Sequence, residues 1–291
     1  MKTFVKNLLP LRTISTFRKW RDELQRARFQ FHLPLTEATL ENVFKGELGL
    51  LRGDVVFVHS STGNLRLTFP VLDIFHLLRE VVGEEGTLLF PTYPRQSSYE
   101  FLISGEVFDV KRSRSYTGLL TEYARRRKEA VRSLHPTKSV CAIGPRGLEL
   151  TTGHNLSPYP YDHDSPYQKI IKAGGKVIGV GVSTSKLSFV HTIDDTLKEA
   201  FPLEPYHKEI FEAKCVSYQN EIVTVMSYAH DMAKMKHNIP KFIKRFCDSH
   251  IARDTKIQGT SFFVVQSKPL YKRMIELARD GITVYDRSVY R

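Results

Sequence analysis

The feature that most constrains the fold of this chain is a repeated alternation between short apolar segments and stretches of helical periodicity. Residues 54–59 and 88–90 are apolar runs of strand length, and residues 74–81 between them carry apolar side chains at the i, i+3, i+4 and i+7 spacing of a helix. Gly83 follows this stretch as a helix stop. The segment therefore predicts a strand–helix–strand unit, the building block of a layered α/β fold.

The alternation continues to the end of the 291-residue chain. Ser165 as N-cap, Pro166 at the first helical position and Gln168 as the second half of a capping box predict the start of a helix, which Gly174 and Gly175 end. The other expected elements are helices over residues 116–123 and 270–278, and strands over residues 139–143, 176–182, 222–226, 262–265 and 282–285. We expect a single layered α/β/α domain with a central, mostly buried sheet and helices on both faces.

The domain organisation follows from composition along the chain. No linker rich in proline, glycine or serine divides the sequence, so we expect one domain over residues 34–291, preceded by a basic, helical extension over residues 1–33. The extension lacks the apolar core and cleavage site of a secretory signal, and no stretch reaches the roughly eighteen apolar residues of a membrane span. We expect a soluble protein whose extension is a candidate cap for a subunit interface in a homo-oligomer.

A disulfide framework and a metal centre are not expected. Cys141, Cys215 and Cys247 lie far apart along the chain, which favours a reducing, cytoplasmic location. The histidine and acidic side chains between residues 154 and 164 match no familiar ligand spacing. These side chains are His154, Asp162, His163 and Asp164.

Charge and glycine content restrict the ligands. The chain holds 43 Lys and Arg against 31 Asp and Glu, a formal net charge of +12, and a basic surface attracts anions. The basic run 125–128 is typical of a solvated helix end. The glycines of residues 174–181 lie before and within an expected strand rather than in a turn that opens a helix, so they do not form a dinucleotide fingerprint. They predict close packing in a central strand instead.

His191 and Asp194 are the most suggestive pair for catalysis. On a helix, the i, i+3 spacing brings Asp194 to the face of His191, and Asp195 at i+4 is a competing partner. A carboxylate that fixes the imidazole tautomer makes the other ring nitrogen a general base near neutral pH. The alternative is a surface His–Asp pair without a catalytic role.

Two further clusters are candidates for ligand binding. His59, Ser60 and Ser61 close an expected strand, and α/β folds bind ligands at the carboxyl ends of their strands; an ordinary strand-end turn is the alternative. The segment 132–139 holds two cations, three hydroxyls and a histidine ahead of another strand. Such donors suit phosphate oxygens, although a solvated loop has the same composition.

Read in order, these motifs resemble the aminoglycoside 3-N-acetyltransferase family over about residues 34 to 200. The motifs are Gly53-Asp54, His59-Ser60-Ser61, Val82-Gly83 with Gly86-Thr87, Arg132-Ser133, His135-Pro136-Thr137, Ser165-Pro166 and His191. Their order is more specific than any one of them.

The resemblance implies a single α/β domain, acetyl-CoA as cosubstrate without a metal, and acetyl transfer to an amino group on a sugar-like ring. By this resemblance His191 removes a proton from the attacking amine, and Asp194 orients the histidine. The charge that develops on the thioester oxygen needs hydrogen-bond donors, for which backbone amides or the hydroxyl of Ser188 are candidates. The coenzyme contacts it implies, together with the strand-end histidine, are His59, Ser60, Ser61, Arg132, Ser133, His135 and Thr137.

The sequence departs from the family pattern at the catalytic segment. The usual Thr-x-x-His-x-x-Glu becomes Ser188-x-x-His191-x-x-Asp194, which shortens the carboxylate by one methylene and leaves Asp195 open as its replacement. The approach to Ser165-Pro166, residues 161–164, looks closer to relatives that act on surface-polysaccharide sugars.

The net charge bears on the acceptor and on the rival classes of function. Because an aminoglycoside is a polycation and the chain is basic, we expect a nucleotide-linked amino sugar as acceptor, with an aminoglycoside antibiotic, and hence antibiotic resistance, as the alternative. A non-enzymatic protein that binds nucleic acid or an anionic surface is the rival from another class. The enzyme interpretation predicts no nucleic-acid partner.

Overall fold

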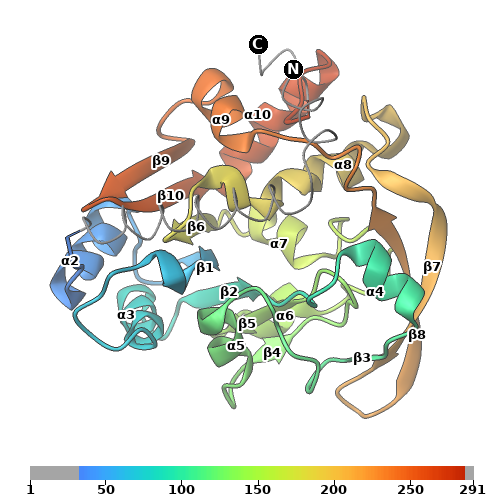
Figure 1. Cartoon of the computed structure of the whole chain (residues 1–291), viewed down its shortest axis with the longest axis horizontal. Coiled ribbons are helices and arrows are strands. Elements are labelled where there is room, and N and C mark those ends of the chain that lie inside the picture. The colour runs from blue at the N-terminus through green and yellow to red at the C-terminus, as the bar shows by residue number, and fades with distance from the viewer. Residues whose placement is uncertain (1–32, 286–291) are drawn as a thin grey trace, which may run out of the picture.

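The computed structural model describes residues 33–285, so the helix expected over residues 1–33 lies almost entirely outside the described part of the chain. A seven-stranded mixed sheet runs through its centre (Figure 1). In order across the sheet, its strands are β4 (Val131–Arg132), β5 (Val140–Ile143), β2 (Thr87–Pro91), β1 (Val55–Ser60), β6 (Lys176–Val180), β10 (Thr260–Gln266) and β9 (Ala252–Ile257).

Helices cover both faces of this sheet, which confirms the expected α/β/α layering. One face packs against α2 (Glu37–Asn42), the π-helix η2 (Val43–Glu47), α3 (Asp73–Val82) and α5 (Leu119–Arg125). The other packs against α6 (Gly147–Thr151), α7 (Pro166–Lys172), α8 (Thr192–Leu197), α9 (Ile239–Phe246) and α10 (Ser267–Arg279).

Strand β1 shows why the sheet is buried on both faces. Val55 and Phe57 enter one hydrophobic core and Val56 and Val58 enter the other, because successive side chains of a strand point to opposite faces. Both cores are closed by helices, so a continuous apolar run is required here in place of the alternation typical of a half-exposed strand.

The parallel part of the sheet creates one edge suited to ligand binding. Strand β1 pairs in parallel with β2 on one side and with β6 on the other. The carboxyl ends of the three strands therefore meet at the same edge, next to Ser61, Thr92 and Gly181. Strands β5 and β10 join the parallel core in antiparallel orientation.

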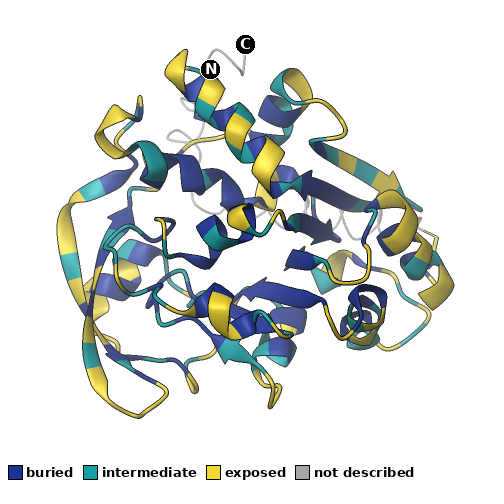
Figure 2. Ribbon diagram, turned by 180° about the vertical axis from the view of Figure 1, so that it is seen from behind, coloured by how far each residue is buried: buried dark blue, intermediate teal, exposed yellow. Residues whose placement is uncertain are grey.

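A second sheet was not expected from the sequence. It consists of β3 (Phe108–Asp109), β7 (Tyr206–Val216) and β8 (Ile222–His230), and it has its own small core against α4 (Ser98–Ser104). Strand β7 is exposed over much of its length, as Figure 2 shows for the long β7–β8 hairpin. Because β7 is rich in charged residues, it has no apolar run that would predict a strand. Of β8, the sequence predicted only residues 222–226.

Two local expectations are wrong. Residues 282–285 form turns and irregular chain, although their apolar composition had predicted a strand. At the start of α7, Ser165 does accept from the backbone N–H of Gln168, but the Gln168 amide donates to Thr196 instead of closing a capping box. In the part of the chain described, no helix is both long and apolar enough to cross a membrane.

Candidate active site

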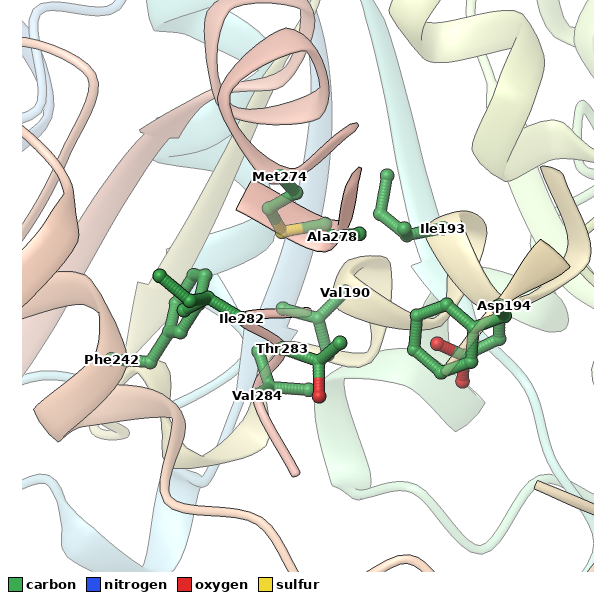
Figure 3. Close-up of a pocket in the computed structure, with 10 residues that line it drawn as sticks. Val190, Ile193, Asp194, Phe242, Met274, Ala278, Ile282, Thr283 and Val284 are labelled. Carbon is green, nitrogen blue, oxygen red and sulfur yellow. The ribbon is translucent and has the colours of Figure 1, made fainter. Parts of the chain in front are cut away.

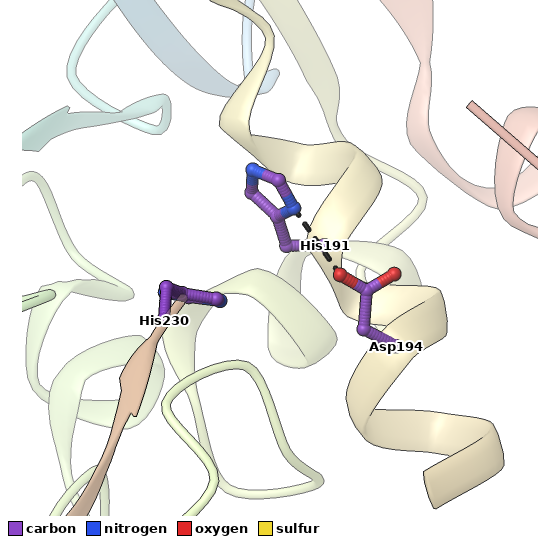
Figure 4. Close-up of side chains that lie close together, drawn as sticks. All are labelled: His191, Asp194 and His230. Carbon is purple, nitrogen blue, oxygen red and sulfur yellow. Dashed lines mark hydrogen bonds and ion pairs between the residues drawn. The ribbon is translucent and has the colours of Figure 1, made fainter. Parts of the chain in front are cut away.

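His191 ends a short 3-10 helix, η5 (Ser188–His191), directly before α8. Its Nδ1 atom lies 3.3 Å from Oδ2 of Asp194 and 2.7 Å from the hydroxyl oxygen of Tyr285. The same hydroxyl donates to Asp194 Oδ2 over 2.6 Å. Figure 4 shows the imidazole and the carboxyl group facing each other across the first turn of α8. The i, i+3 pair is thus in contact, and a tyrosine is its third member.

The competing carboxyl group, Asp195, points elsewhere. It is fully buried, and it accepts the backbone N–H of Tyr161 over 2.6 Å and the hydroxyl of Tyr206. These two bonds connect α8 to the loop ahead of α7 and to β7. Of the two adjacent aspartates, Asp194 is therefore the one that contacts His191.

Apolar side chains pack against one side of this pair. Figure 3 shows Val190, Ile193 and Val284 gathered near Asp194, together with side chains of α9 and α10, and the space left between them is about 10 Å³. Burial raises the pKa of Asp194 to about 8, against the lowering effect of the bond from Tyr285, and burial lowers the pKa of His191 to about 3. His191 is therefore neutral at pH 7. Its pKa differs from the value near neutral pH that the sequence had predicted, because burial disfavours the charged imidazolium.

Ser188, at the other end of η5 from His191, borders a cavity. Its hydroxyl oxygen accepts from the Tyr93 hydroxyl over 3.2 Å. It lines a cavity of about 340 Å³ at the carboxyl ends of β1, β2 and β6, together with His59, Ser60 and Ser61. The strand-end cluster expected from the sequence and the first residue of η5 therefore share one cavity.

The β1 cluster offers polar atoms to this cavity. Within residues 33–285, His59 Nε2 and Ser60 Oγ are buried without a hydrogen-bond partner. Burial lowers the pKa of His59 to about 3, and its ring lies against Phe57, with the centroids 5.2 Å apart. Buried polar atoms are costly unless something bonds them, so these two are available to a ligand.

The cavity wall depends on a close backbone approach at Gly181. Its φ of +73° lies in the left-handed region, and a Cβ atom there would lie 2.5 Å from the Ser61 carbonyl oxygen. The Asn64 amide donates to the Gly181 carbonyl over 2.8 Å, which ties the turn after β1 to the end of β6.

The structure does not bring the second expected cluster to this cavity. Arg132 is buried, with guanidinium bonds to the Thr92 and Ser113 carbonyls, and it stacks on Phe108 at 4.7 Å. It borders a different cavity of about 340 Å³, which also contains Arg95 and Arg114. Arg132, expected to contact the coenzyme, therefore does not line the cavity that Ser188 borders.

The neighbours of Arg132 in the sequence are internal as well. Ser133 donates to His154 Nδ1 over 2.8 Å, because the other nitrogen of that ring donates to the Pro160 carbonyl. His135 accepts the backbone N–H groups of Thr137 and Lys138 at its Nδ1 atom. Ser133, His135 and Thr137 are all at most 1% exposed, so they hold the segment between β4 and β5 in place rather than face the cavity.

Sequence reasoning missed two residues next to His191, Tyr285 and His230. Tyr285 was assigned to a strand, and His230 ends β8, which comes from the second sheet. Ligand atoms of His191, Asp194 and His230 lie within 4.8 Å of one another (Figure 4), but the Tyr285 hydroxyl already bonds the first two. No local pattern could have found either residue, because each reaches the site from a distant part of the chain.

Comparison with protein families gives one match that covers most of the chain. The model of the aminoglycoside 3-N-acetyltransferase family matches residues 57–279, which include most of β1 and all of η5 and α10. This confirms the resemblance found in the motifs.

Curated relatives carry the same name. Aminoglycoside N(3)-acetyltransferase III of Serratia marcescens is 30% identical over 161 residues, which cover 50% of this chain and 58% of the relative. Aminoglycoside N(3)-acetyltransferase VII of Streptomyces paromomycinus is 30% identical over 159 residues, 50% of this chain and 55% of the relative. The chain thus aligns with somewhat more than half the length of these relatives. Their names refer to aminoglycosides and give no support to the expected kinship with polysaccharide-sugar enzymes.

Solved structures with the same fold extend over nearly the whole chain. The crystal structure of the aminoglycoside acetyltransferase AAC(3)-Xa superposes with a TM-score of 0.73 at 20% identity, covering 91% of this chain and 99% of its own. The structure described as "AAC-IIIb binary with CoASH" gives 0.69 at 22% identity, with 86% and 98% covered. At these identities the likeness concerns the fold. With the family model matching well over half of its residues, the chain belongs to the aminoglycoside 3-N-acetyltransferase family.

Proposed function

We propose that the chain is an acetyl-CoA-dependent N-acetyltransferase that acts on an amino group of an aminoglycoside, the 3-amino group of the family name. The observation that carries this proposal is the turn η5, which has Ser188 on a cavity at one end and His191, paired with Asp194, at the other. A base for the amine and a cavity for the thioester then lie within one helical turn, the arrangement that direct transfer requires.

The cavity at the end of β1 is the proposed site of the pantetheine arm. Its volume of about 340 Å³ suits part of a small molecule, and the ammonium group of Lys186 at its rim suits an anionic coenzyme. The unpartnered polar atoms of His59 and Ser60 can bond the amides of the arm. A structural neighbour of the same fold is a binary complex with CoASH, which agrees with this cosubstrate. We assign Arg132, Ser133, His135 and Thr137 to support of the neighbouring loop.

The proposed reaction forms a nitrogen–carbon bond and breaks a carbon–sulfur bond. Nε2 of His191 takes a proton from the acceptor amine as the amine attacks the thioester carbonyl. The carbonyl oxygen gains negative charge, which the Ser188 hydroxyl would stabilise as a hydrogen-bond donor. Collapse of the intermediate expels the coenzyme as thiolate, and the proton on His191 passes to that sulfur. The products are the amide and free coenzyme A.

A second cavity, of about 380 Å³, is the proposed acceptor site. It is bordered by Asp194 and by the carboxylates of Glu199 and Glu204, and it contains three tyrosines, Tyr159, Tyr206 and Tyr228. Two lysines, Lys198 and Lys208, also line it. Lys198 is paired with Asp162, with the charged atoms 3.2 Å apart, and Glu204 is paired with Lys234 at 3.7 Å, so Glu199 is the carboxylate of this lining for which we propose the main contact with an ammonium group. Carboxylates and aromatic faces are suitable partners for the ammonium groups of an aminoglycoside.

The basic net charge does not argue against a polycationic acceptor. Residues 1–28 hold eight basic and two acidic residues, and they contribute half of the excess charge. They precede the part of the chain that matches the family, so the whole-chain charge says little about the acceptor cavity. The nucleotide-linked amino sugar expected from the net charge is therefore less well supported than the aminoglycoside.

Release of the coenzyme thiol provides the test. We expect the protein to release thiol from acetyl-CoA in the presence of sisomicin or gentamicin, each of which is bound in a structural neighbour, with the product acetylated at the 3-amino group by NMR. His191→Asn should abolish thiol release and leave coenzyme binding intact, whereas His163→Asn, at an exposed histidine, should leave both unchanged. Turnover with nucleotide-linked amino sugars alone would contradict the acceptor, and salt-dependent nucleic-acid binding without any thiol release would favour the non-enzymatic rival.

A further inference from the structure

Tyr285 occupies the space between the two members of the catalytic pair. The direct distance from His191 Nδ1 to Asp194 Oδ2 is 3.3 Å, which is long for a bond to a carboxylate, whereas the distances through the Tyr285 hydroxyl are 2.7 Å and 2.6 Å. We propose that Tyr285 is a positioning residue whose hydroxyl relays the hydrogen bond from His191 to Asp194 and so compensates for the short aspartate side chain. This inference rests on the proposed function of His191.

The direction of the two bonds fixes the imidazole tautomer. Above about pH 8, Asp194 is a carboxylate and can only accept. Burial keeps the pKa of the Tyr285 phenol well above its usual value, so in this state the hydroxyl keeps its proton and donates it to Asp194. Its oxygen can then accept from His191 only if Nδ1 carries the proton. The other ring nitrogen, Nε2, is left with a free lone pair, as a general base needs.

The surroundings of Tyr285 hold its ring in this position. The side chain is 7% exposed, and its backbone N–H donates to the Thr283 hydroxyl over 3.2 Å. The ring stands edge-on to Phe201 at 6.0 Å. The preceding residues 282–284 pack among the apolar side chains of α9 and α10, as Figure 3 shows. The irregular segment after α10, which the sequence had predicted to be a strand, thus delivers a hydroxyl to the site.

Two variants and one rescue separate a relay from a packing role. Tyr285→Phe keeps the ring and removes the hydroxyl, and we expect kcat/KM to fall by about tenfold to a hundredfold, the range for a hydrogen bond to a charged group. Because the lost bond favours the carboxylate form of Asp194, the rise of kcat with pH should also move to higher pH. The longer carboxylate of Asp194→Glu should reach Nδ1 directly, so adding it to Tyr285→Phe should restore most of the activity.

Tyr271→Phe is the matched control, because Tyr271 also donates a single hydroxyl bond to α8, to Thr196 over 3.1 Å, away from the pair. It should leave the pH profile unchanged. Wild-type activity and pH profile in Tyr285→Phe would overturn the relay, as would failure of the glutamate rescue.

A measurement on the ligand-free protein keeps the relay distinct from the proposed function. The nitrogen NMR shifts of His191, assigned by comparison with His191→Asn, should show the Nδ1-protonated tautomer in the wild type and a change in Tyr285→Phe. A wild-type ring protonated at Nε2 would overturn the relay whatever the activity. A wild type that acetylates no acceptor, but has the expected tautomer, would refute the proposed function and leave the relay standing.

Discussion

Burial sets the charge of the residues around His191. Burial lowers the pKa values of His191 and His230 and raises the pKa of Asp194, so each group moves toward its neutral form in the folded protein. A neutral His191 has a lone pair for the proton of the acceptor amine. The raised pKa of Asp194 means that ionisation of its carboxyl group lowers the stability of the folded protein. Asp194 is therefore expected to serve the proposed reaction and, when ionised, to reduce the free energy of unfolding.

The variant Asp194→Asn tests this conflict. The carboxyl pKa is about 8 in the folded protein and near 4 in the unfolded chain, so the unfolded state loses its proton first and stability falls as the pH rises from about 4 to 8. The asparagine variant lacks this dependence. We expect it to turn over poorly yet to unfold with a free energy about 2 kcal/mol or more above wild type at pH 9, with a smaller gap at pH 5. Urea unfolding at both pH values measures the gap; an equal gap at both would contradict the assignment.

At the scale of elements, the contact between β6 and β10 positions the end of β6, which leads to the cavity that Ser188 borders. Gly179 of β6 pairs with Phe263 of β10, and a Cβ atom on Gly179 would lie 2.1 Å from the Phe263 ring. The close packing expected from this glycine-rich segment is thus confirmed. Since β6 ends two residues before Val182, which lines the cavity, a shift of the strand would reach the proposed coenzyme site.

Replacing Gly179 by alanine should therefore affect stability and binding together. We expect a loss of about 1–3 kcal/mol in unfolding free energy, the range for overpacking a core, and weaker coenzyme binding. Gly46→Ala is the control, because a Cβ atom at Gly46 has open space around it. Thermal unfolding and calorimetric titration with coenzyme A give the two readouts. A stable Gly179→Ala protein with normal coenzyme affinity would show that Phe263 moves aside at little cost.

At the scale of the whole molecule, the site is assembled between two sheets. The large sheet provides the edge of the proposed coenzyme site through β1, while the β7–β8 hairpin of the small sheet brings His230 next to His191 and Tyr206 next to His230. The acceptor cavity lies where α8, the segment after it and this hairpin meet. Its local carboxylates, more than the net charge of +12, are expected to govern attraction of a cationic acceptor.

Salt and charge variants test this local control. Glu199→Gln combined with Glu204→Gln should raise the KM for sisomicin about tenfold and flatten its dependence on ionic strength, since screening weakens attraction between exposed charges. The KM for acetyl-CoA should change little. Glu212→Gln, an exposed glutamate on β7 outside the cavity, is the control. If all three proteins show the same KM at every salt concentration, these carboxylates do not bind the acceptor.

Local patterns predicted much of the large sheet and the residues at its edge. Strand β1, helix α3 and the N-cap at Ser165 follow from periodicity and capping, which act over a few residues. The pairing of His191 with Asp194 likewise follows from helical spacing over three positions. These features needed no knowledge of the rest of the chain.

The sequence by itself determined the layered fold class, the family motifs and a histidine with two possible carboxylate partners. The tertiary structure alone decided that Asp194 is the aspartate in contact with His191, that the segment 132–137 is internal, and that Tyr285 joins the pair across 94 positions of sequence. The physical reason is that burial and hydrogen bonding between distant segments depend on how the elements pack, and no periodicity within one segment records that packing.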